Sequence, residues 1–154
     1  MITCSTRILL ADDDEDDCFF FDKILTGLSV ATTLTVVGDG EQLMNLLRQE
    51  STPLPDLLFL DLNMPRLNGL ECLTAIKSDE RLTHLPVVIL STFIAPEIEA
   101  KLHTLGAMHC IQKATDYNQL KARIEQTIGV LRTTANAPAG ETRTSNTSSV
   151  GELL

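Results

Sequence analysis

Aromatic residues are scarce in this sequence, which contains no tryptophan and in which phenylalanine and tyrosine make up 4% of 154 residues. No phosphate-binding glycine loop follows the first strand-like segment either, so a flavin-binding domain is not expected. Basic residues are also few, with 12 lysines and arginines against 21 acidic residues and a net charge of −9. This balance argues against a broad basic face for nucleic acid or anionic membranes, and it favours cations or basic surfaces as partners.

Long hydrophobic runs are absent as well. Apolar runs such as Leu57–Leu60 and Val87–Leu90 are far shorter than the roughly 20 residues that a membrane-spanning helix needs. The first residues lack a basic region followed by an apolar stretch, so we expect no secretory signal and a cytoplasmic location.

The cysteines also lack a metal-binding or redox spacing. None of them forms a CxxC pair, and they are scattered among apolar neighbours: Cys4, Cys18, Cys72 and Cys110. The sequence therefore predicts reduced, mostly buried thiols rather than a zinc or redox site.

Apolar residues make up 44% of the chain, enough for one folded domain. Short apolar segments alternate with amphipathic ones. Strands are predicted at 7–11, 32–37, 57–60, 87–90 and 108–111. Helices are predicted at 16–28, 41–50, 69–78 and 117–131, with a further helix that has Pro96 in its first turn and Gly106 as its C-terminal cap. The alternation predicts an α/β fold, a (βα)5 three-layer sandwich with a parallel sheet covered by helices on both faces. We assign residues 1–132 to this domain and expect 133–154, rich in Ser, Thr and Asn, to be a disordered polar tail.

Polar residues follow most of the predicted strands, where sites form in open parallel sheets. Six consecutive acidic residues, Asp12–Asp17, follow the first strand, and Asp61 follows the third. Ser91 and Thr92 follow the fourth strand, and Lys113 follows the fifth. The sequence therefore predicts a cluster of carboxylates, a hydroxyl and a lysine at one edge of the sheet.

This combination suits phosphoryl transfer. Adjacent carboxylates repel one another unless they share a cation or bind protons, and Mg²⁺ prefers oxygen ligands. A carboxylate such as Asp61 can form an aspartyl-phosphate. Mg²⁺ and Lys113 would neutralise two of the three phosphoryl oxygens, and the Ser91 hydroxyl would donate a hydrogen bond to the third.

Each residue also has an ordinary structural interpretation. Glu15–Asp17 suit a helix N-terminus, Ser91 suits a helix cap, and Lys113 could be a surface lysine. Asp12 and Asp13 precede the helix, so the helix dipole explains them poorly. Asp61 could be a turn residue, but an acid directly after a buried strand is costly unless it is solvated or used. Each residue alone is weak evidence for a functional site, but together, each after a different strand, they are strong evidence for one.

Residues 6–132 resemble the receiver domain of bacterial response regulators of the chemotaxis type. The polar loop Ser78–Leu85 further resembles single-domain regulators paired with hybrid or phytochrome-type sensor kinases. The motifs that carry the resemblance are Leu10–Asp14, Asp61–Pro65 with Gly69, Ser91–Thr92, Leu105–Ala107 and Lys113.

The resemblance implies a flavodoxin-like fold with strand order 2-1-3-4-5. It implies that Asp61 accepts a phosphoryl group from a histidine kinase or a histidine phosphotransfer protein. Asp12, Asp13 and Asp61, with the backbone carbonyl of Asn63, would hold Mg²⁺, while Ser91 would move toward the phosphoryl group and Lys113 would pair with it. The chain would be a signalling domain rather than an enzyme, with its output through protein binding.

Two positions depart from the family pattern. Ala114 stands where the family has a proline joined by a cis bond, and we expect a trans bond because a cis non-proline bond costs about 2.5–4 kcal/mol. Cys110 stands where the family has its switch aromatic, so no ring rotation can report phosphorylation there.

Three further positions are candidates for modulation or binding. Thr92 and Phe93 follow the switch hydroxyl, and in this family the position of Phe93 helps control water access to the phosphoryl group. An apolar ring there predicts slow self-dephosphorylation. Phe19 lies opposite Phe21 on a helical wheel, and it is either a partly covered surface ring or a contact for a kinase helical bundle.

Two other functions remain open at this stage. A small Mg²⁺-dependent phosphatase would use Asp61 as a covalent nucleophile, but the chain has Asn63 where such enzymes have a second acid. A degenerate receiver would bind partners without phosphorylation, which the departures at Cys110 and Ala114 leave open. The downstream target and the formation of a homodimer also stay open.

Overall fold

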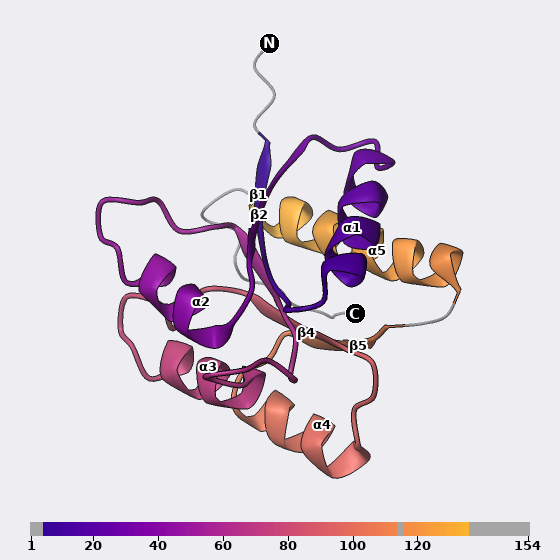
Figure 1. Cartoon of the computed structure of the whole chain (residues 1–154). Helices are drawn as coiled ribbons and strands as arrows, with labels where there is room; N and C mark the ends of the chain where they lie inside the picture. The colour runs from indigo at the N-terminus through magenta and orange to yellow at the C-terminus, as the bar shows by residue number, and fades with distance from the viewer. Residues whose placement is uncertain (1–4, 114–115, 136–154) are drawn as a thin grey trace, which may run out of the picture. The chain divides into compact units, whose positions relative to one another are not determined.

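The computed structural model describes residues 5–113 and 116–135, shown in colour in Figure 1. The chain divides into two compact units between Thr115 and Asp116. The first contains β1 (Thr6–Ala11), α1 (Glu15–Thr26), β2 (Thr32–Val37), α2 (Gly40–Leu47), β3 (Leu57–Leu60), α3 (Gly69–Lys77), β4 (Val87–Ser91), α4 (Pro96–Thr104) and β5 (His109–Gln112). The second is described as one helix, α5 (Tyr117–Ala135).

The five strands form one parallel sheet in the order β2-β1-β3-β4-β5. This confirms the predicted flavodoxin-like (βα)5 topology. The register pairs Ala11 at the end of β1 with Leu60 at the end of β3, and the Asp61 amide continues the ladder by donating to the Ala11 carbonyl at 3.0 Å. The residues that follow β1 and β3 therefore lie side by side.

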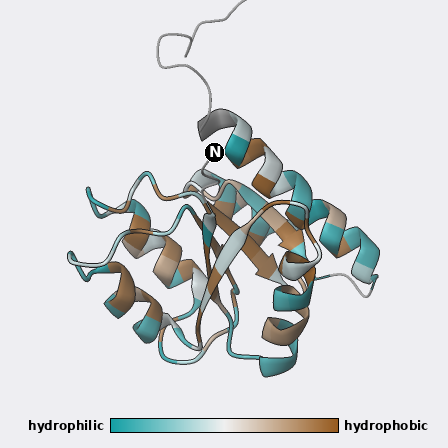
Figure 2. Ribbon diagram, turned by 90° about the horizontal axis from the view of Figure 1, so that it is seen from above, coloured by the Kyte–Doolittle hydropathy of each residue, from teal (hydrophilic) through white to brown (hydrophobic). Residues whose placement is uncertain are grey.

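Helices of the first unit lie on both faces of the sheet (Figure 1). On one face, α2, α3 and α4 bury apolar residues against alternate strand positions, which point to the same side of a sheet. Figure 2 shows the strands coloured largely as hydrophobic. This core includes Leu9, Leu58, Leu60, Val87 and Ile89 from the strands, and Leu43, Leu47, Leu73, Ile76 and Leu102 from the helices.

The other face of the sheet carries α1. Its Phe21 ring lies 4.9 Å from the Phe59 ring of β3, centroid to centroid, in an edge-on arrangement. Both side chains are almost completely buried, whereas Phe19 is 59% exposed. The helical-wheel prediction for these two phenylalanines is therefore confirmed. Phe21 packs against the sheet, and Phe19 lies on the exposed side of α1.

The local sequence determines where α1 and α3 begin after the loops that follow β1 and β3. Asp14 caps α1 by accepting from the Asp17 amide at 3.1 Å. Asn68 and Glu71 form a reciprocal capping box at the start of α3. Gly69 follows directly, and a β-carbon there would lie 2.3 Å from the Asp61 carbonyl oxygen. Only glycine therefore lets α3 begin so close to the end of β3.

Several element ends differ from the sequence prediction. The first helix covers Glu15–Thr26 rather than 16–28, because Asp14 provides its cap. Pro96 occupies the first turn of α4, and Gly106 follows that helix with φ of 111°, as the sequence indicated.

The second unit begins with a side-chain cap and extends beyond its predicted end. Asp116 Oδ1 accepts from the amides of Asn118 at 2.9 Å and Gln119 at 3.4 Å. The helix ends at Ala135 instead of Leu131, so the assigned polar tail overlaps its last turn. Residues 136–154 of that tail lie outside the described residues. Within the described ranges, no helix combines the length and apolar character that crossing a membrane requires.

Candidate functional site

Three carboxylates meet at the carboxyl ends of β1 and β3. Asp12 and Asp61 are buried, with 2% and 6% of their surfaces exposed, while Asp13 is exposed. One carboxylate oxygen from each of the three lies within 4.8 Å of the others. The parallel register of β1 and β3 produces this cluster, because it places residues 12 and 61 at the same level of the sheet.

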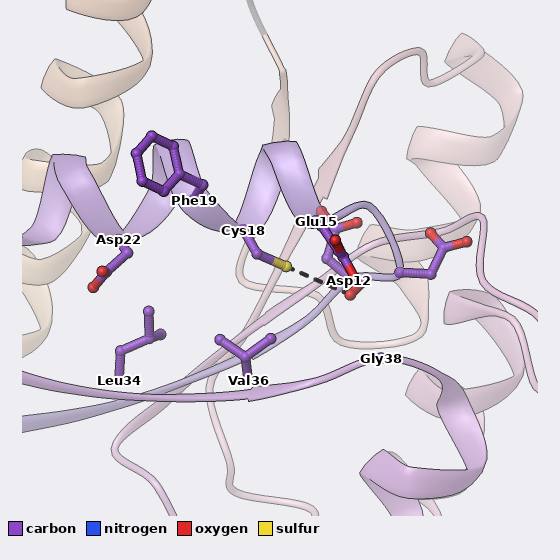
Figure 3. A pocket seen from close by; sticks show the side chains of 9 residues that line it. Asp12, Glu15, Cys18, Phe19, Asp22, Leu34, Val36 and Gly38 are labelled. Carbon is purple, nitrogen blue, oxygen red and sulfur yellow. Dashed lines mark hydrogen bonds between the residues drawn. The ribbon is translucent and has the colours of Figure 1, made fainter.

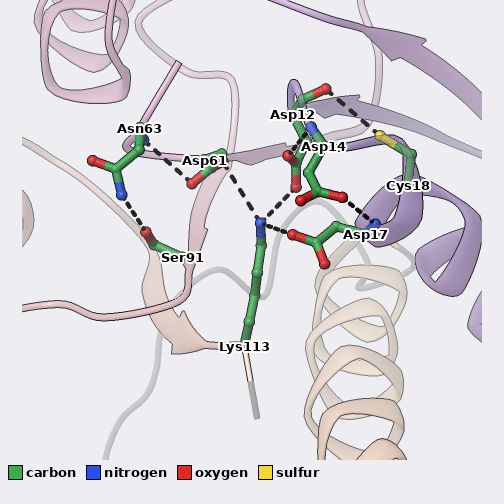
Figure 4. Close-up of polar contacts among 8 residues, drawn as sticks. All are labelled: Asp12, Asp14, Asp17, Cys18, Asp61, Asn63, Ser91 and Lys113. Carbon is green, nitrogen blue, oxygen red and sulfur yellow. Dashed lines mark hydrogen bonds and ion pairs between the residues drawn. The ribbon is translucent and has the colours of Figure 1, made fainter. Parts of the chain in front are cut away.

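Lys113 reaches these carboxylates from the end of β5. Its Nζ atom lies 2.7 Å from Oδ2 of Asp12, 2.7 Å from Oδ2 of Asp17 and 3.6 Å from Oδ2 of Asp61 (Figure 4). Burial lowers the pKa of Lys113, but the hydrogen bonds to Asp12 and Asp17 outweigh it and raise that pKa above its usual value. The lysine is therefore a permanent cation at neutral pH.

Asp12 is held in place from two sides. Its Oδ2 accepts from Lys113, and its Oδ1 accepts from the Asp14 amide at 2.9 Å. Burial nevertheless raises the pKa of Asp12, because desolvation of its carboxylate outweighs these favourable contacts, and the charge of Asp61 adds to the rise. A cation near both carboxylates would relieve this cost.

Ser91 and Asn63 form the other side of the site. Ser91 ends β4 and is completely buried. Its Oγ lies 3.5 Å from Nδ2 of Asn63, and the Asn63 amide donates to Oδ1 of Asp61 at 3.3 Å (Figure 4). The Lys113 amide donates to the Ser91 carbonyl at 2.7 Å, which joins the ends of β4 and β5. The hydroxyl, the carboxylate and the ammonium thus belong to one connected set of contacts.

The charges of this set favour a divalent cation. One ammonium contacts Asp12, Asp17 and Asp61, and Asp13 adds a fourth negative charge beside them. The three clustered ligands are all carboxylate oxygens, the type that Mg²⁺ and Mn²⁺ prefer. The donor set therefore fits a hard divalent ion.

The predicted modulating residues that the structure describes follow β4 or lie on β5. Thr92 and Phe93 follow β4 and are exposed, Phe93 by 67%. Cys110 lies half-buried on β5, where burial raises the pKa of its thiol to about 11. Of the three described cysteines only Cys72 is fully buried, so the prediction of mostly buried thiols holds for one of them. Ala114 lies outside the described residues.

An open groove of about 610 Å³ borders the acidic cluster between α1 and β2. Figure 3 shows Phe19 at its outer wall, with Leu34 and Val36 of β2 below and Glu15 and Asp22 along α1. Val36 is 45% exposed on this edge strand. The groove therefore combines apolar side chains with carboxylates.

One member of the site was missed by sequence reasoning. Asp17 was interpreted as a charge that complements the helix dipole of α1, yet its carboxylate contacts Lys113. The available signal was its spacing from Asp14, because the cap places residue 17 in the first turn of α1, from which its carboxylate reaches Lys113 at the end of β5.

Comparison with known proteins identifies the family. The description "Response regulator receiver domain" matches residues 8–125. Response regulator Rcp1 of Synechocystis sp. is 36% identical over 89 residues, which cover 55% of this chain and 60% of that protein. Protein RcaC of Microchaete diplosiphon is 29% identical over 132 residues, 84% of this chain and 19% of that protein. The chain thus matches less than two thirds of the length of these relatives.

Solved structures agree with this assignment. The phosphorylated cyanobacterial phytochrome response regulator RcpA superposes with a TM-score of 0.79 at 32% identity, covering 88% of this chain and 99% of that one. The Mn²⁺-bound form of response regulator Rcp1 gives a TM-score of 0.76 at 27% identity, covering 86% and 99%. The suggested likeness to phytochrome-type regulators is thereby confirmed, and the chain belongs to the response regulator receiver domain family.

Proposed function

We propose that this receiver domain accepts a phosphoryl group on Asp61 from a phosphohistidine, in a reaction that depends on Mg²⁺. The observation that carries the proposal is the meeting of Asp12, Asp13 and Asp61 oxygens within 4.8 Å, with the Lys113 ammonium 3.6 Å from Asp61. A nucleophilic carboxylate, a hard-cation site and a fixed ammonium are the parts that phosphoryl transfer requires.

The chain's own residues have distinct roles in this reaction. The Asp61 carboxylate forms a bond to phosphorus as the nitrogen–phosphorus bond of the phosphohistidine breaks, and the bonding electrons remain on the imidazole nitrogen. The Asn63 amide orients Asp61 through its contact to Oδ1. Lys113 neutralises charge on the transferred group, and the Ser91 hydroxyl donates to one of its oxygens.

Asp12, Asp13 and Asp61, with the backbone carbonyl of Asn63, would hold Mg²⁺. The ion would supply neutralisation of phosphoryl charge and orientation of the group for in-line attack. The Mn²⁺-bound form of Rcp1 and the oxygen-only donor set in this chain support this assignment.

A test of the proposal uses the full chain with acetyl phosphate, with and without Mg²⁺. We expect a gain in mass of one phosphoryl group that requires Mg²⁺ and is lost in Asp61→Asn. Asp13→Asn should weaken the Mg²⁺ dependence because it removes a ligand. Asp56→Asn provides the control, since Asp56 precedes β3 and binds Arg7 at the opposite end of the strand. Equal phosphorylation of Asp61→Asn and the unchanged chain would exclude Asp61.

The alternatives predict different results in the same assays. A phosphatase would turn over small phosphate esters, but Asn63 rather than an acid stands two residues after Asp61, so we expect no turnover. A receiver that binds partners without phosphorylation would stay unmodified under every donor. The intact set of Asp13, Asp61, Ser91 and Lys113 supports phosphorylation over that second possibility.

We further propose that the donor is a histidine kinase of the phytochrome type or a phosphotransfer protein, and that the reaction takes place in the cytoplasm. The likeness to RcpA and Rcp1 supports this choice of donor. The output would then pass through protein binding to a partner that the phosphorylated domain recognises.

Phe19 is proposed as a contact for the donor, because its exposed ring lines the groove beside the acidic cluster. Phe19→Ala should slow phosphotransfer from a phosphorylated kinase while leaving the reaction with acetyl phosphate unchanged. Phe20→Ala is the matched control, since Phe20 is 52% exposed on the same helix and is not among the residues that line the groove. Intact transfer to Phe19→Ala, or equal loss in both variants, would contradict this role.

A further inference from the structure

A second cluster of metal-binding side chains lies where α4 packs beside β5. Glu99 and His103 are one helical turn apart on α4, so they share a face, and Cys110 comes from the middle of β5. Nε2 of His103 lies 3.8 Å from Oε2 of Glu99. One ligand atom of each of the three residues lies within 4.8 Å of the other two.

These spacings suit a tetrahedral ion. Zinc binds imidazole nitrogen and carboxylate oxygen at about 2.0–2.2 Å and thiolate sulfur at about 2.3 Å, so its ligands lie roughly 3.3–3.8 Å apart. The Glu99 and His103 side chains are about half exposed, at 48% and 46%, so both have room to change rotamer around a bound ion. The sulfur is positioned by the strand, because Cys110 pairs with Ile89 of β4 in the sheet.

The donor set also selects a different class of ion from the one that fits the acidic site. Asp12, Asp13 and Asp61 offer only hard carboxylate oxygens, whereas the α4–β5 cluster offers sulfur, nitrogen and one oxygen. Thiolate and imidazole ligands favour Zn²⁺ over Mg²⁺. The two clusters share no residue, so each can be removed by substitution without altering the other.

We propose that Glu99, His103 and Cys110 form a binding site for Zn²⁺ or a similar borderline-soft divalent ion, with a water molecule as the fourth ligand. Binding forms a bond from the metal to the Cys110 sulfur and breaks the sulfur–hydrogen bond, and the proton passes to solvent. The metal would tie α4 to β5, the strand that Lys113 directly follows.

The site is tested with Co²⁺ and then Zn²⁺, added to the full reduced chain in the presence of saturating Mg²⁺ to occupy the acidic site. Co²⁺ bound to a thiolate has an intense near-ultraviolet band, which carboxylate ligands do not produce. We expect this band to appear, Zn²⁺ to displace it, and one proton to be released to the solution per thiolate bound. Cys110→Ser should abolish the band.

The other two ligands are tested by affinity. His103→Ala and Glu99→Gln should each weaken Zn²⁺ binding by at least about 10-fold. Removal of a residue that only hydrogen-bonds to a metal ligand already costs about that much affinity, and loss of a ligand should cost no less. His109→Ala and Glu97→Gln are the matched controls. His109 adjoins Cys110 but points to the opposite face of the sheet, and Glu97 is an acidic residue on α4 outside the cluster. Both controls should bind as the unchanged chain does.

Three results would overturn the proposal. The thiolate band could fail to appear, it could persist in Cys110→Ser and so belong to another cysteine, or the control variants could lose as much affinity as His103→Ala. Circular dichroism of each variant confirms that it is folded, and a metal-dependent rise in melting temperature should accompany binding in the folded controls but not in Cys110→Ser.

Discussion

The Nζ atom of Lys113 lies 2.7 Å from Oδ2 of Asp17, so the end of β5 is tied to the first turn of α1. The same ammonium is 3.6 Å from Asp61. If Asp61 is phosphorylated as proposed, Asp17 and the phosphoryl group would compete for the Lys113 ammonium, and this competition would set how firmly Lys113 pairs with the phosphoryl group.

Asp17→Asn should strengthen that pairing. Loss of one competing carboxylate leaves Lys113 freer to contact the phosphoryl oxygens. An ion pair whose carboxylate is still partly exposed, here 36% for Asp17, is worth up to about 1 kcal/mol. We expect the half-life of the phosphorylated form to increase roughly two- to fivefold, as measured by the decay of the modified mass after removal of donor. Asp16→Asn, an exposed neighbour in the same turn, should have no effect. An unchanged or shortened half-life in Asp17→Asn would show that the contact does not compete.

Phe93 should slow the loss of the phosphoryl group, because its exposed apolar ring offers no hydrogen bond to an attacking water. Phe93→Glu introduces a carboxylate that can orient and deprotonate this water, so the half-life should fall about 10-fold or more. Phe20→Glu makes the same charge change on α1 and serves as the control. Equal half-lives for the unchanged chain, Phe93→Glu and Phe93→Ala would show that Phe93 does not control the loss of the phosphoryl group.

Gly69→Ala should damage both stability and the site. The added β-carbon would lie 2.3 Å from the Asp61 carbonyl oxygen and 2.8 Å from the Leu62 α-carbon, so the backbone beside the nucleophile must move. We expect a loss of about 1–3 kcal/mol in the free energy of unfolding, together with slower phosphorylation by acetyl phosphate.

The matched control for that change is Gly129→Ala in α5, where an added β-carbon meets no atom within 4 Å. Alanine is favoured over glycine in a helix by about 0.5–1 kcal/mol, so this variant should be slightly more stable than the unchanged chain. Urea unfolding distinguishes the two outcomes, and destabilisation of similar size in both variants would contradict the steric explanation.

Stability should fall between about pH 9 and pH 11. Burial raises the pKa of the Cys72 thiol from 9.0 to about 11, so in this range the unfolded chain releases a proton that the folded chain keeps. The stabilisation is therefore complete below pH 9 and is lost as pH rises through 11. Each pKa unit corresponds to about 1.4 kcal/mol, which bounds the contribution at roughly 3 kcal/mol.

Urea unfolding at several pH values checks this prediction. Cys72→Ala should show a shallower fall than the unchanged chain, while the half-buried Cys18 and Cys110 contribute to the slope that remains. Ile76→Val is a buried change on the same helix that should lower stability by about 0.5–1.5 kcal/mol at every pH. An identical slope in Cys72→Ala and Ile76→Val would show that the Cys72 thiol does not cause the fall.

Much of this architecture could be predicted because its signals are local. The strands at 32–37 and 57–60 begin and end as predicted. The first is a β-branched run that ends before Gly38, and the second is an apolar run bounded by Asp56 and Asp61. The alternation of strands and helices then places Asp61 and Lys113 at one edge of the sheet. The end of α5 was misplaced because the polar residues after Leu131 continue a helix without an apolar signal.

Contacts between elements could not be predicted in the same way. The Asp17–Lys113 ion pair depends on how α1 packs against the sheet, and an acid at a helix start has a sufficient local explanation. The Glu99, His103 and Cys110 cluster likewise has no sequence motif, because one of its members comes from a strand and the others from a helix. Such groupings become visible only when the packing is known.

The central claim is that Asp61 is the residue that receives the phosphoryl group. The most direct measurement treats the chain with acetyl phosphate and Mg²⁺, reduces the acyl-phosphate with borohydride, and locates the resulting homoserine by peptide mass spectrometry. We predict homoserine at position 61, in amounts that fall when Mg²⁺ is removed. Homoserine at position 12 or 13, or no conversion of Asp61 with any phosphodonor, would contradict the account.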